Sequence, residues 1–198
     1  MIDTIKLYLS AANDLTAERD LVSRVVAEIP VTLGWKINLS PIGNKAFDER
    51  LILETDLHLL LLGEDIRAPI GFEWYLSRQV GRKPTFLIKN NILRTLAAGD
   101  FLRTISNYPK ILFYHSLADF RKKVLNHIGQ HLLEQAEFFT IKSEEFENLS
   151  IFLEDLEEIE PEILDNVTGE NSIILTRERF IPKGGVLIQP PEDEQNPE

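Results

Sequence analysis

Ser10-Ala-Ala-Asn-Asp-Leu-Thr-Ala-Glu-Arg19 is the stretch of sequence that decides the fold. It directly follows the apolar run Ile5–Leu9, which predicts a strand, and it opens a segment whose apolar residues recur at helical spacing. Asn13 or Asp14 is expected to cap that helix. In α/β proteins, a strand that ends in a short polar loop before a helix is a common ligand site. The reason is that free backbone N–H groups and the helix dipole point into the crevice.

Strand and helix patterns alternate along the following hundred residues. Leu57-His-Leu-Leu-Leu-Leu62 is an unbroken apolar run, typical of a central strand that is covered on both faces of a parallel sheet. The alternation predicts an α/β fold with a doubly wound, five-stranded parallel sheet in the order 2-1-3-4-5. We expect strands over residues 4–10, 35–39, 57–62, 84–88 and 111–114, and helices over 14–29, 45–54, 70–80 and 116–138. Residues 91–105 are expected to form one or two irregular helices around Gly99.

In this strand order, the crevice between the first and third strands is the expected ligand site. Residues that follow these two strands converge there because the carboxyl ends of parallel strands lie at one edge of a sheet. The candidate ligand-binding residues are Ser10 and Ala11 after the first strand, and Gly63, Glu64 and Asp65 after the third.

The charge of the chain is unevenly distributed. Residues 144–198 carry 16 acidic and 3 basic side chains, whereas residues 1–143 carry 16 acidic and 18 basic ones, so the net charge of −11 belongs to the C-terminal part. No dense lysine and arginine stripe with interleaved aromatic residues occurs, which argues against a nucleic acid partner. The chain has no cysteine, no apolar run of membrane-spanning length and no signal peptide pattern, so we expect a cytoplasmic protein without membrane association.

The C-terminal part of the chain differs from the rest in pattern. We expect an α/β domain over residues 1–138, an acidic helical and hairpin extension or linker over 139–190, and a disordered tail over 191–198. Ser143 is expected to cap an acidic helix with an apolar stripe, and residues 172–176 and 185–189 to pair as a hairpin. The apolar stripe makes this extension a candidate surface for a protein partner or for self-association.

Several motifs together resemble a known family. Ser10–Arg19 is similar to the S-S-T-x-x-D-L-x-x-E-R signature of an uncharacterised TIR-like family that is often fused to STAND-type NTPases in bacteria. Thr55-Asp56 with the following leucines and Gly63 resembles its third strand, and Gly71-Phe-Glu-Trp-Tyr75 its glutamate-bearing helix. Gly81-Arg-Lys-Pro84 and Phe113–Phe120 resemble its later motifs, so the likeness spans about residues 4–135.

The resemblance implies a flavodoxin-like fold and a specific chemistry. Active members of the wider superfamily, which includes nucleoside deoxyribosyltransferases, use a glutamate on the helix after the third strand at C1′ of a ribose. Glu73 is its counterpart here. The implied function is a bacterial defence effector that cleaves the N-glycosidic bond of NAD or a nucleotide, with assembly needed for activity and without a bound cofactor.

Two other functions remain open from the sequence. Ala11 and Ala12 stand where the family has Ser and Thr, which favours a non-catalytic adaptor that recruits a partner. A phospho-receiver fits less well, because the first strand is not followed by paired acids.

We expect no metal site: His127 and His131 are four residues apart on one helix, but the sequence lacks the H-E-x-x-H motif. Glu73 as a solvated residue paired with Arg67 or Arg78 is the non-functional alternative for that side chain.

Overall fold

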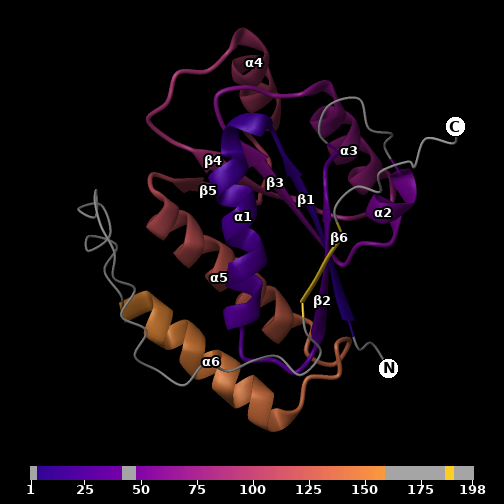
Figure 1. The fold of residues 1–198 in the computed structure, drawn as a ribbon, viewed down its shortest axis with the longest axis vertical. Coiled ribbons are helices and arrows are strands. Elements are labelled where there is room, and N and C mark those ends of the chain that lie inside the picture. The colour runs from indigo at the N-terminus through magenta and orange to yellow at the C-terminus, as the bar shows by residue number, and fades with distance from the viewer. Residues whose placement is uncertain (1–3, 42–47, 159–185, 190–198) are drawn as a thin grey trace, which may run out of the picture.

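The chain forms a parallel sheet with helices on both faces (Figure 1). The structure is a computed structural model, and it describes residues 4–41, 48–158 and 186–189. The strands are ordered β5-β4-β3-β1-β2-β6, and every adjacent pair is parallel. The strands are β1 (Thr4–Ala11), β2 (Gly34–Leu39), β3 (Leu57–Leu62), β4 (Thr85–Lys89), β5 (Ile111–Tyr114) and β6 (Val186–Gln189). The helices are α1 (Thr16–Val25), α2 (Glu49–Leu53), α3 (Ala68–Gln79), α4 (Leu96–Ile105), α5 (Leu117–Glu134) and α6 (Ser143–Glu158).

The predicted five-stranded order 2-1-3-4-5 is confirmed. β3 lies in the middle of these five strands, and all six of its side chains are buried. Leu59 and Leu61 point into the core beneath α1 and α5, whereas Leu60 and Leu62 point into the core on the opposite face. The two-residue period of a strand therefore requires apolar residues at consecutive positions here, which explains the unbroken run.

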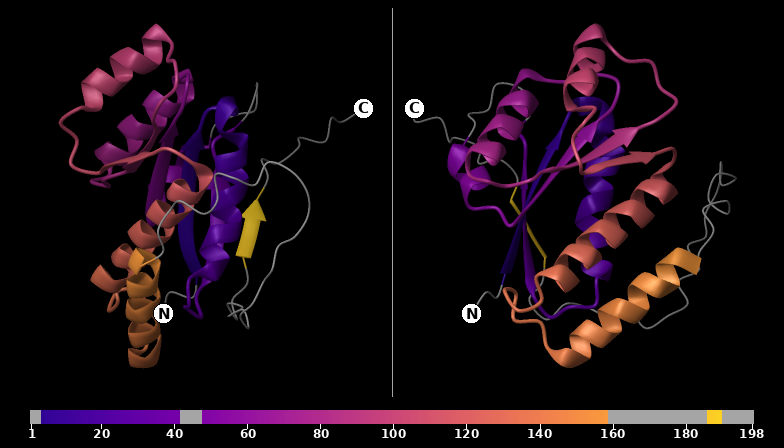
Figure 2. Two further views of the ribbon diagram at one scale, coloured as in Figure 1. Left: turned by 90° about the vertical axis from the view of Figure 1, so that its left-hand side faces the viewer. Right: turned by 180° about the vertical axis from the view of Figure 1, so that it is seen from behind.

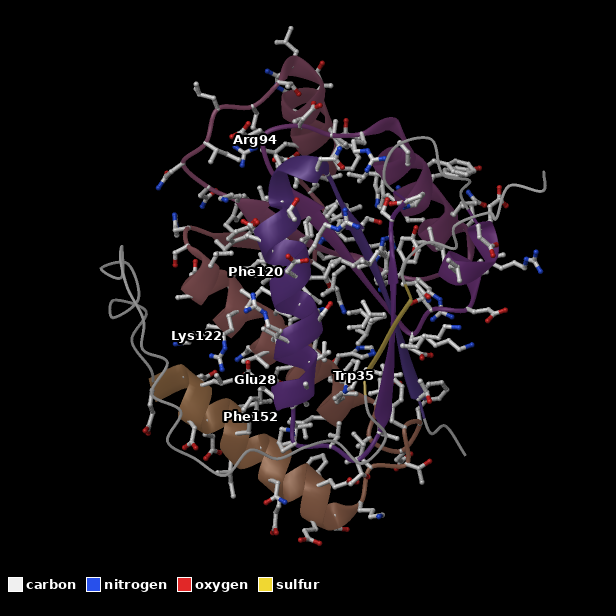
Figure 3. The ribbon with its side chains drawn as sticks, viewed as in Figure 1. Glu28, Trp35, Arg94, Phe120, Lys122 and Phe152 are labelled. Atoms are coloured by element: carbon white, nitrogen blue, oxygen red, sulfur yellow. The ribbon has the colours of Figure 1, made fainter. Side chains whose placement is uncertain are left out.

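The helices form two layers that enclose the sheet (Figure 2). α1 and α5 pack together on one face, and α6 packs on the outside of α5. Phe120 of α5 belongs to the large core on this face, and Phe152 of α6 packs against the same core (Figure 3). On the other face, Trp74 of α3 and Phe101 of α4 contact Phe86 of β4 in a smaller aromatic core.

The predicted elements differ from the observed ones in detail. The cap expected from Asn13 or Asp14 is wrong: a 3-10 turn at Asn13–Leu15 precedes α1, and its N-cap is Ala12, without a side-chain hydrogen bond. The helix expected over 91–105 begins only at Leu96, where the Thr95 hydroxyl caps it. Ser116, the first residue of the helix expected over 116–138, caps α5 by accepting a hydrogen bond from the amide of Asp119, and α5 ends at Glu134.

The C-terminal part contributes a helix and a strand to this domain. Ser143, which was expected to cap this helix, is the first residue of α6, and Leu149, Leu153 and Leu156 of α6 are buried in the core shared with α5. The carboxylate of Glu145 accepts a hydrogen bond from the backbone amide of Thr32 (2.9 Å). Val186–Gln189 adds a sixth strand in parallel to β2, a pairing that the sequence did not predict. The other half of the expected hairpin, residues 172–176, and the tail 191–198 lie outside the described residues.

None of the helices in the described ranges is long and apolar enough to cross a membrane.

The packing of α6 on α5 depends on Gly129. A Cβ atom at this position would lie 2.6 Å from Cδ2 of Leu153, whereas a Cβ atom at Gly99 of α4 would meet nothing within 4 Å. Gly129→Ala is therefore expected to lower the free energy of unfolding by about 1–3 kcal/mol through overpacking. Gly99→Ala is the matched control, and we expect it to raise the free energy of unfolding by about 0.5–1 kcal/mol because alanine favours the helix. Urea unfolding measures both, and equal effects of the two substitutions would contradict this packing.

Candidate functional site

The candidate site lies at the carboxyl edge of the sheet, where β1 adjoins both β2 and β3. In the strand register, Ala11 at the end of β1 is paired with Leu61 of β3, and Leu9 is paired with Leu39 of β2. The expectation that the exits of the first and third strands are neighbours is therefore confirmed. The crossovers from β1 and β3 run to opposite faces of the sheet, as a switch point requires.

Glu73 is the central acidic residue of this edge. Ile70, Glu73 and Ser77 recur at helical spacing on α3, and all three are completely buried against the sheet. The Glu73 Oε1 atom accepts hydrogen bonds from the Tyr8 hydroxyl of β1 (3.0 Å) and from the Ser40 hydroxyl after β2 (2.6 Å). Its Oε2 atom is also buried and has no hydrogen-bond partner among the described residues.

This geometry corrects the alternative of a solvated Glu73 paired with Arg67 or Arg78. Arg78 lies over the ring of Trp74, at 5.2 Å from the ring centre, and Arg67 donates to the carbonyl of Pro41 (2.8 Å). The Glu73 side chain therefore has no exposure to solvent and no ion pair with either arginine. Burial against Glu73 raises the pKa of the Tyr8 phenol, first through desolvation and then through the neighbouring negative charge, so Tyr8 stays a hydrogen-bond donor.

Ser10, a predicted ligand-binding residue, is buried in a chain of hydrogen bonds. Its hydroxyl lies 2.8 Å from Nε2 of His58, and Nδ1 of His58 lies 2.7 Å from the Ser77 hydroxyl of α3. The His58 ring also meets Tyr8 edge to face, with ring centres 5.4 Å apart. Complete burial lowers the pKa of His58 to about 3, so the ring is neutral and connects the two hydroxyl groups.

Of the three predicted residues after β3, Glu64 and Asp65 form the exposed rim of the edge. Gly63 is buried, and a Cβ atom there would lie 2.1 Å from the carboxylate of Asp14, which accepts a hydrogen bond from the Glu64 amide (2.7 Å). The side chains of Glu64 and Asp65 are exposed. A hydrogen bond from the Thr95 hydroxyl (2.6 Å) lowers the pKa of Asp65.

Ala11, the remaining predicted ligand-binding residue, is completely buried in the core on the α1 side. All five predicted ligand-binding residues lie at or just after the carboxyl ends of β1 and β3, but the hydrogen bonds of Glu73 go to Tyr8 and Ser40 and to none of the five. Ser10, Ala11 and Gly63 are buried, and Glu64 and Asp65 are exposed.

Two arginines that the sequence analysis did not assign to the ligand site complete this edge. Nη2 of Arg19, on α1, lies 3.4 Å from the carbonyl oxygen of Ser40, and Nη2 of Arg67 lies 2.8 Å from that of Pro41. Arg67 also donates through Nη1 to the side chain of Asn13 (3.3 Å). Burial, and then the adjacent positive charge of Arg67, lower the pKa of Arg19.

A second polar cluster lies at the ends of β4 and β5. Glu18 of α1 is buried and accepts from Lys89 (2.9 Å) and from the Tyr114 hydroxyl (3.3 Å). The consecutive residues Glu18 and Arg19 therefore contact different strand ends. Glu18 forms an ion pair with Lys89 of β4, and Arg19 contacts the residue that follows β2.

The two spaced histidines of α5 lie at the opposite edge of the sheet. His127 Nε2 is 2.7 Å from the Thr85 hydroxyl, and burial lowers the pKa of His127 to about 4. Together with Lys110 and Glu134, both histidines line a cavity of about 210 Å³. Within the described ranges, no three histidine, aspartate or glutamate side chains are grouped so that they could hold a metal ion.

The buried His58 predicts a specific pH dependence of stability. Its pKa is near 6.5 when unfolded and about 3 when folded, so the unfolded state binds the proton first and stability is lost as the pH falls below about 6.5. Between pH 7 and pH 5 this single group is expected to remove about 2 kcal/mol from the free energy of unfolding. His58→Gln should remove that part of the pH dependence, whereas the control His115→Gln, at an exposed position, should keep the wild-type slope. Urea unfolding at both pH values tests this, and an unchanged slope in His58→Gln would show that His58 titrates normally.

Comparison of the chain with protein-family models, with curated proteins and with solved structures found no match.

Proposed function

We propose that this chain is a TIR-like effector of a bacterial defence system that cleaves the N-glycosidic bond of NAD or a related nucleotide, with Glu73 as the catalytic carboxylate. One observation carries the proposal. A glutamate is completely buried at the switch point of a doubly wound sheet, with one carboxylate oxygen held by two hydroxyl groups and the other without a donor among the described residues. Unpartnered buried carboxylate oxygens are costly, and they are found where a protein keeps a group ready for chemistry.

The proposed chemistry uses the two carboxylate oxygens differently. Tyr8 and Ser40 orient the carboxylate through Oε1, and Oε2 has no hydrogen-bond partner among the described residues and is the oxygen that would act on the substrate. When the bond between C1′ and the base nitrogen breaks, its electron pair leaves with the base and the ribose becomes positively charged. Oε2 stabilises this charge or bonds to C1′. A water molecule then adds to C1′ and displaces Oε2 where that bond has formed, and its proton passes to the released base or, when the base leaves as a neutral molecule such as nicotinamide, to solvent. In this proposal Glu64 and Asp65 at the rim accept hydrogen bonds from ribose hydroxyl groups.

The proposed reaction requires that the ribose of the substrate can reach Glu73. Glu73, Tyr8 and Ser40 have almost no exposed surface, so a ribose reaches Oε2 only after the carboxyl edge opens locally. A requirement for opening agrees with the expectation that assembly or a partner activates the protein, because binding energy from either source can stabilise an open conformation.

The same burial favours a second candidate function, a non-catalytic adaptor. In that case Glu73 serves to hold α3 against β1 and the exit of β2. Exposed apolar side chains on α6, such as Phe146 and Ile151, among the acidic residues of this helix, would then supply a docking surface for a protein partner.

Release of free base separates the two functions. The protein is incubated with NAD, with nucleotides and with nucleosides, with and without a crowding agent, and the free base is quantified by chromatography. We expect base release from at least one substrate, and Glu73→Gln should reduce the rate by about 100-fold or more while keeping the hydrogen bonds of Oε1. Glu147→Gln on the exposed surface of α6 is the matched control and should retain full activity.

Absence of base release under every condition, or equal rates for the wild-type protein and Glu73→Gln, would remove the enzyme proposal and leave the adaptor.

A further inference from the structure

Two guanidinium groups meet at the carboxyl edge although they come from separate elements. Arg19 belongs to α1 and Arg67 immediately precedes α3, yet they donate to the carbonyl oxygens of the consecutive residues Ser40 and Pro41. The arginines are close enough that the charge of Arg67 lowers the pKa of Arg19. Like charges brought together in this way repel each other, so the arrangement costs free energy unless a negative charge offsets it.

The partners of these two arginines are neutral. Among the described residues, no carboxylate lies within ion-pair distance of either group, whereas Arg50, Arg103 and Arg121 each have one. Arg19 is 6% exposed, and its hydrogen bond to Ser40 is long at 3.4 Å. Among the described residues, the acceptor that this side chain reaches is a neutral carbonyl oxygen, so its positive charge is not paired with a negative one by contact.

Two carboxylates of this edge have other partners. Asp14 accepts from the Glu64 amide, and Oε1 of Glu73 is held by Tyr8 and Ser40. The charges of Glu73 and of the exposed Asp20 act on Arg19 only through space. The pair therefore keeps positive charge that nearby side chains do not neutralise by contact.

We propose that Arg19 and Arg67 bind a phosphate group of the ligand, and that the substrate is consequently a nucleotide or dinucleotide and not a free nucleoside. Guanidinium groups bind phosphate oxygens through paired, charge-assisted hydrogen bonds. Arg67 is only partly buried, so one face of the pair is accessible from solvent. The N-terminus of α3 follows Arg67 and has no side-chain cap, which adds a favourable dipole for an anion.

Ser40 connects the phosphate site to the proposed catalytic carboxylate. Its hydroxyl donates to Glu73 and its carbonyl oxygen accepts from Arg19. A phosphate that draws Arg19 away from this carbonyl therefore acts on the same residue that orients Glu73. This inference rests on the proposed function for the identity of the bond that is cleaved, but the binding preference that it predicts does not depend on catalysis.

Binding to the Glu73→Gln protein tests the phosphate site without turnover. Affinities for AMP and adenosine are measured by titration calorimetry on the full chain at two salt concentrations. We expect AMP to bind at least ten times more tightly than adenosine, with the difference shrinking at high salt. Arg67→Gln should abolish the preference for AMP, Arg67→Lys should retain part of it, and the control Arg103→Gln on α4 should leave it unchanged.

The outcomes separate this inference from the proposed function. Equal affinities for AMP and adenosine, no measurable binding of either, or a preference for AMP that persists in Arg67→Gln would overturn the phosphate site. A preference for AMP that depends on Arg67, without base release by the wild-type protein, would support the site and remove the enzyme. Base release from nucleosides as fast as from nucleotides would keep the enzyme and overturn the phosphate site.

Discussion

The carboxyl edge of this protein is organised by one buried negative charge. A carboxylate without solvent contact is tolerated only when hydrogen bonds replace the water that it has lost, and Glu73 obtains two of them from Tyr8 and Ser40. These donors lie on β1 and just after β2, whereas Glu73 lies on α3. The single side chain therefore ties a helix to two strands, and it fixes where the crossover after β3 must sit.

Polar side chains beside Glu73 form a second set of hydrogen bonds between α3 and β1. Ser77, one helical turn after Glu73, bonds to His58, and His58 bonds to Ser10 on β1. Burial keeps the His58 ring neutral, so this row of hydrogen bonds places no second charge close to Glu73. These polar side chains thus lie on the face of the sheet that α3 covers, where they alternate along β1 with the apolar residues of the larger core. On the other side of Glu73, the Ser40 carbonyl oxygen accepts a hydrogen bond from Arg19.

The sequence predicted the sheet well because each strand carries its signal locally. The leucines of β3 and the Ser10–Arg19 stretch required no knowledge of distant residues, and the neighbouring exits of β1 and β3 followed from the strand order. The burial of Glu73 was not predicted, because glutamate is rarely buried and its donors are 65 and 33 residues away in the chain. Its position between the buried Ile70 and Ser77 was the available signal. The pairing of β6 with β2 is also a long-range contact, and no local pattern distinguishes it from a hairpin.

A double-mutant cycle between Tyr8 and Glu73 tests the central claim most directly. The free energy of unfolding is measured for the wild-type protein, Tyr8→Phe, Glu73→Met and the double variant. A hydroxyl that donates to a buried carboxylate predicts a coupling energy of about 1.5–3 kcal/mol, because each single change removes the same interaction. Additive effects, within about 0.3 kcal/mol, would show that the two side chains do not interact and would contradict this account of the carboxyl edge.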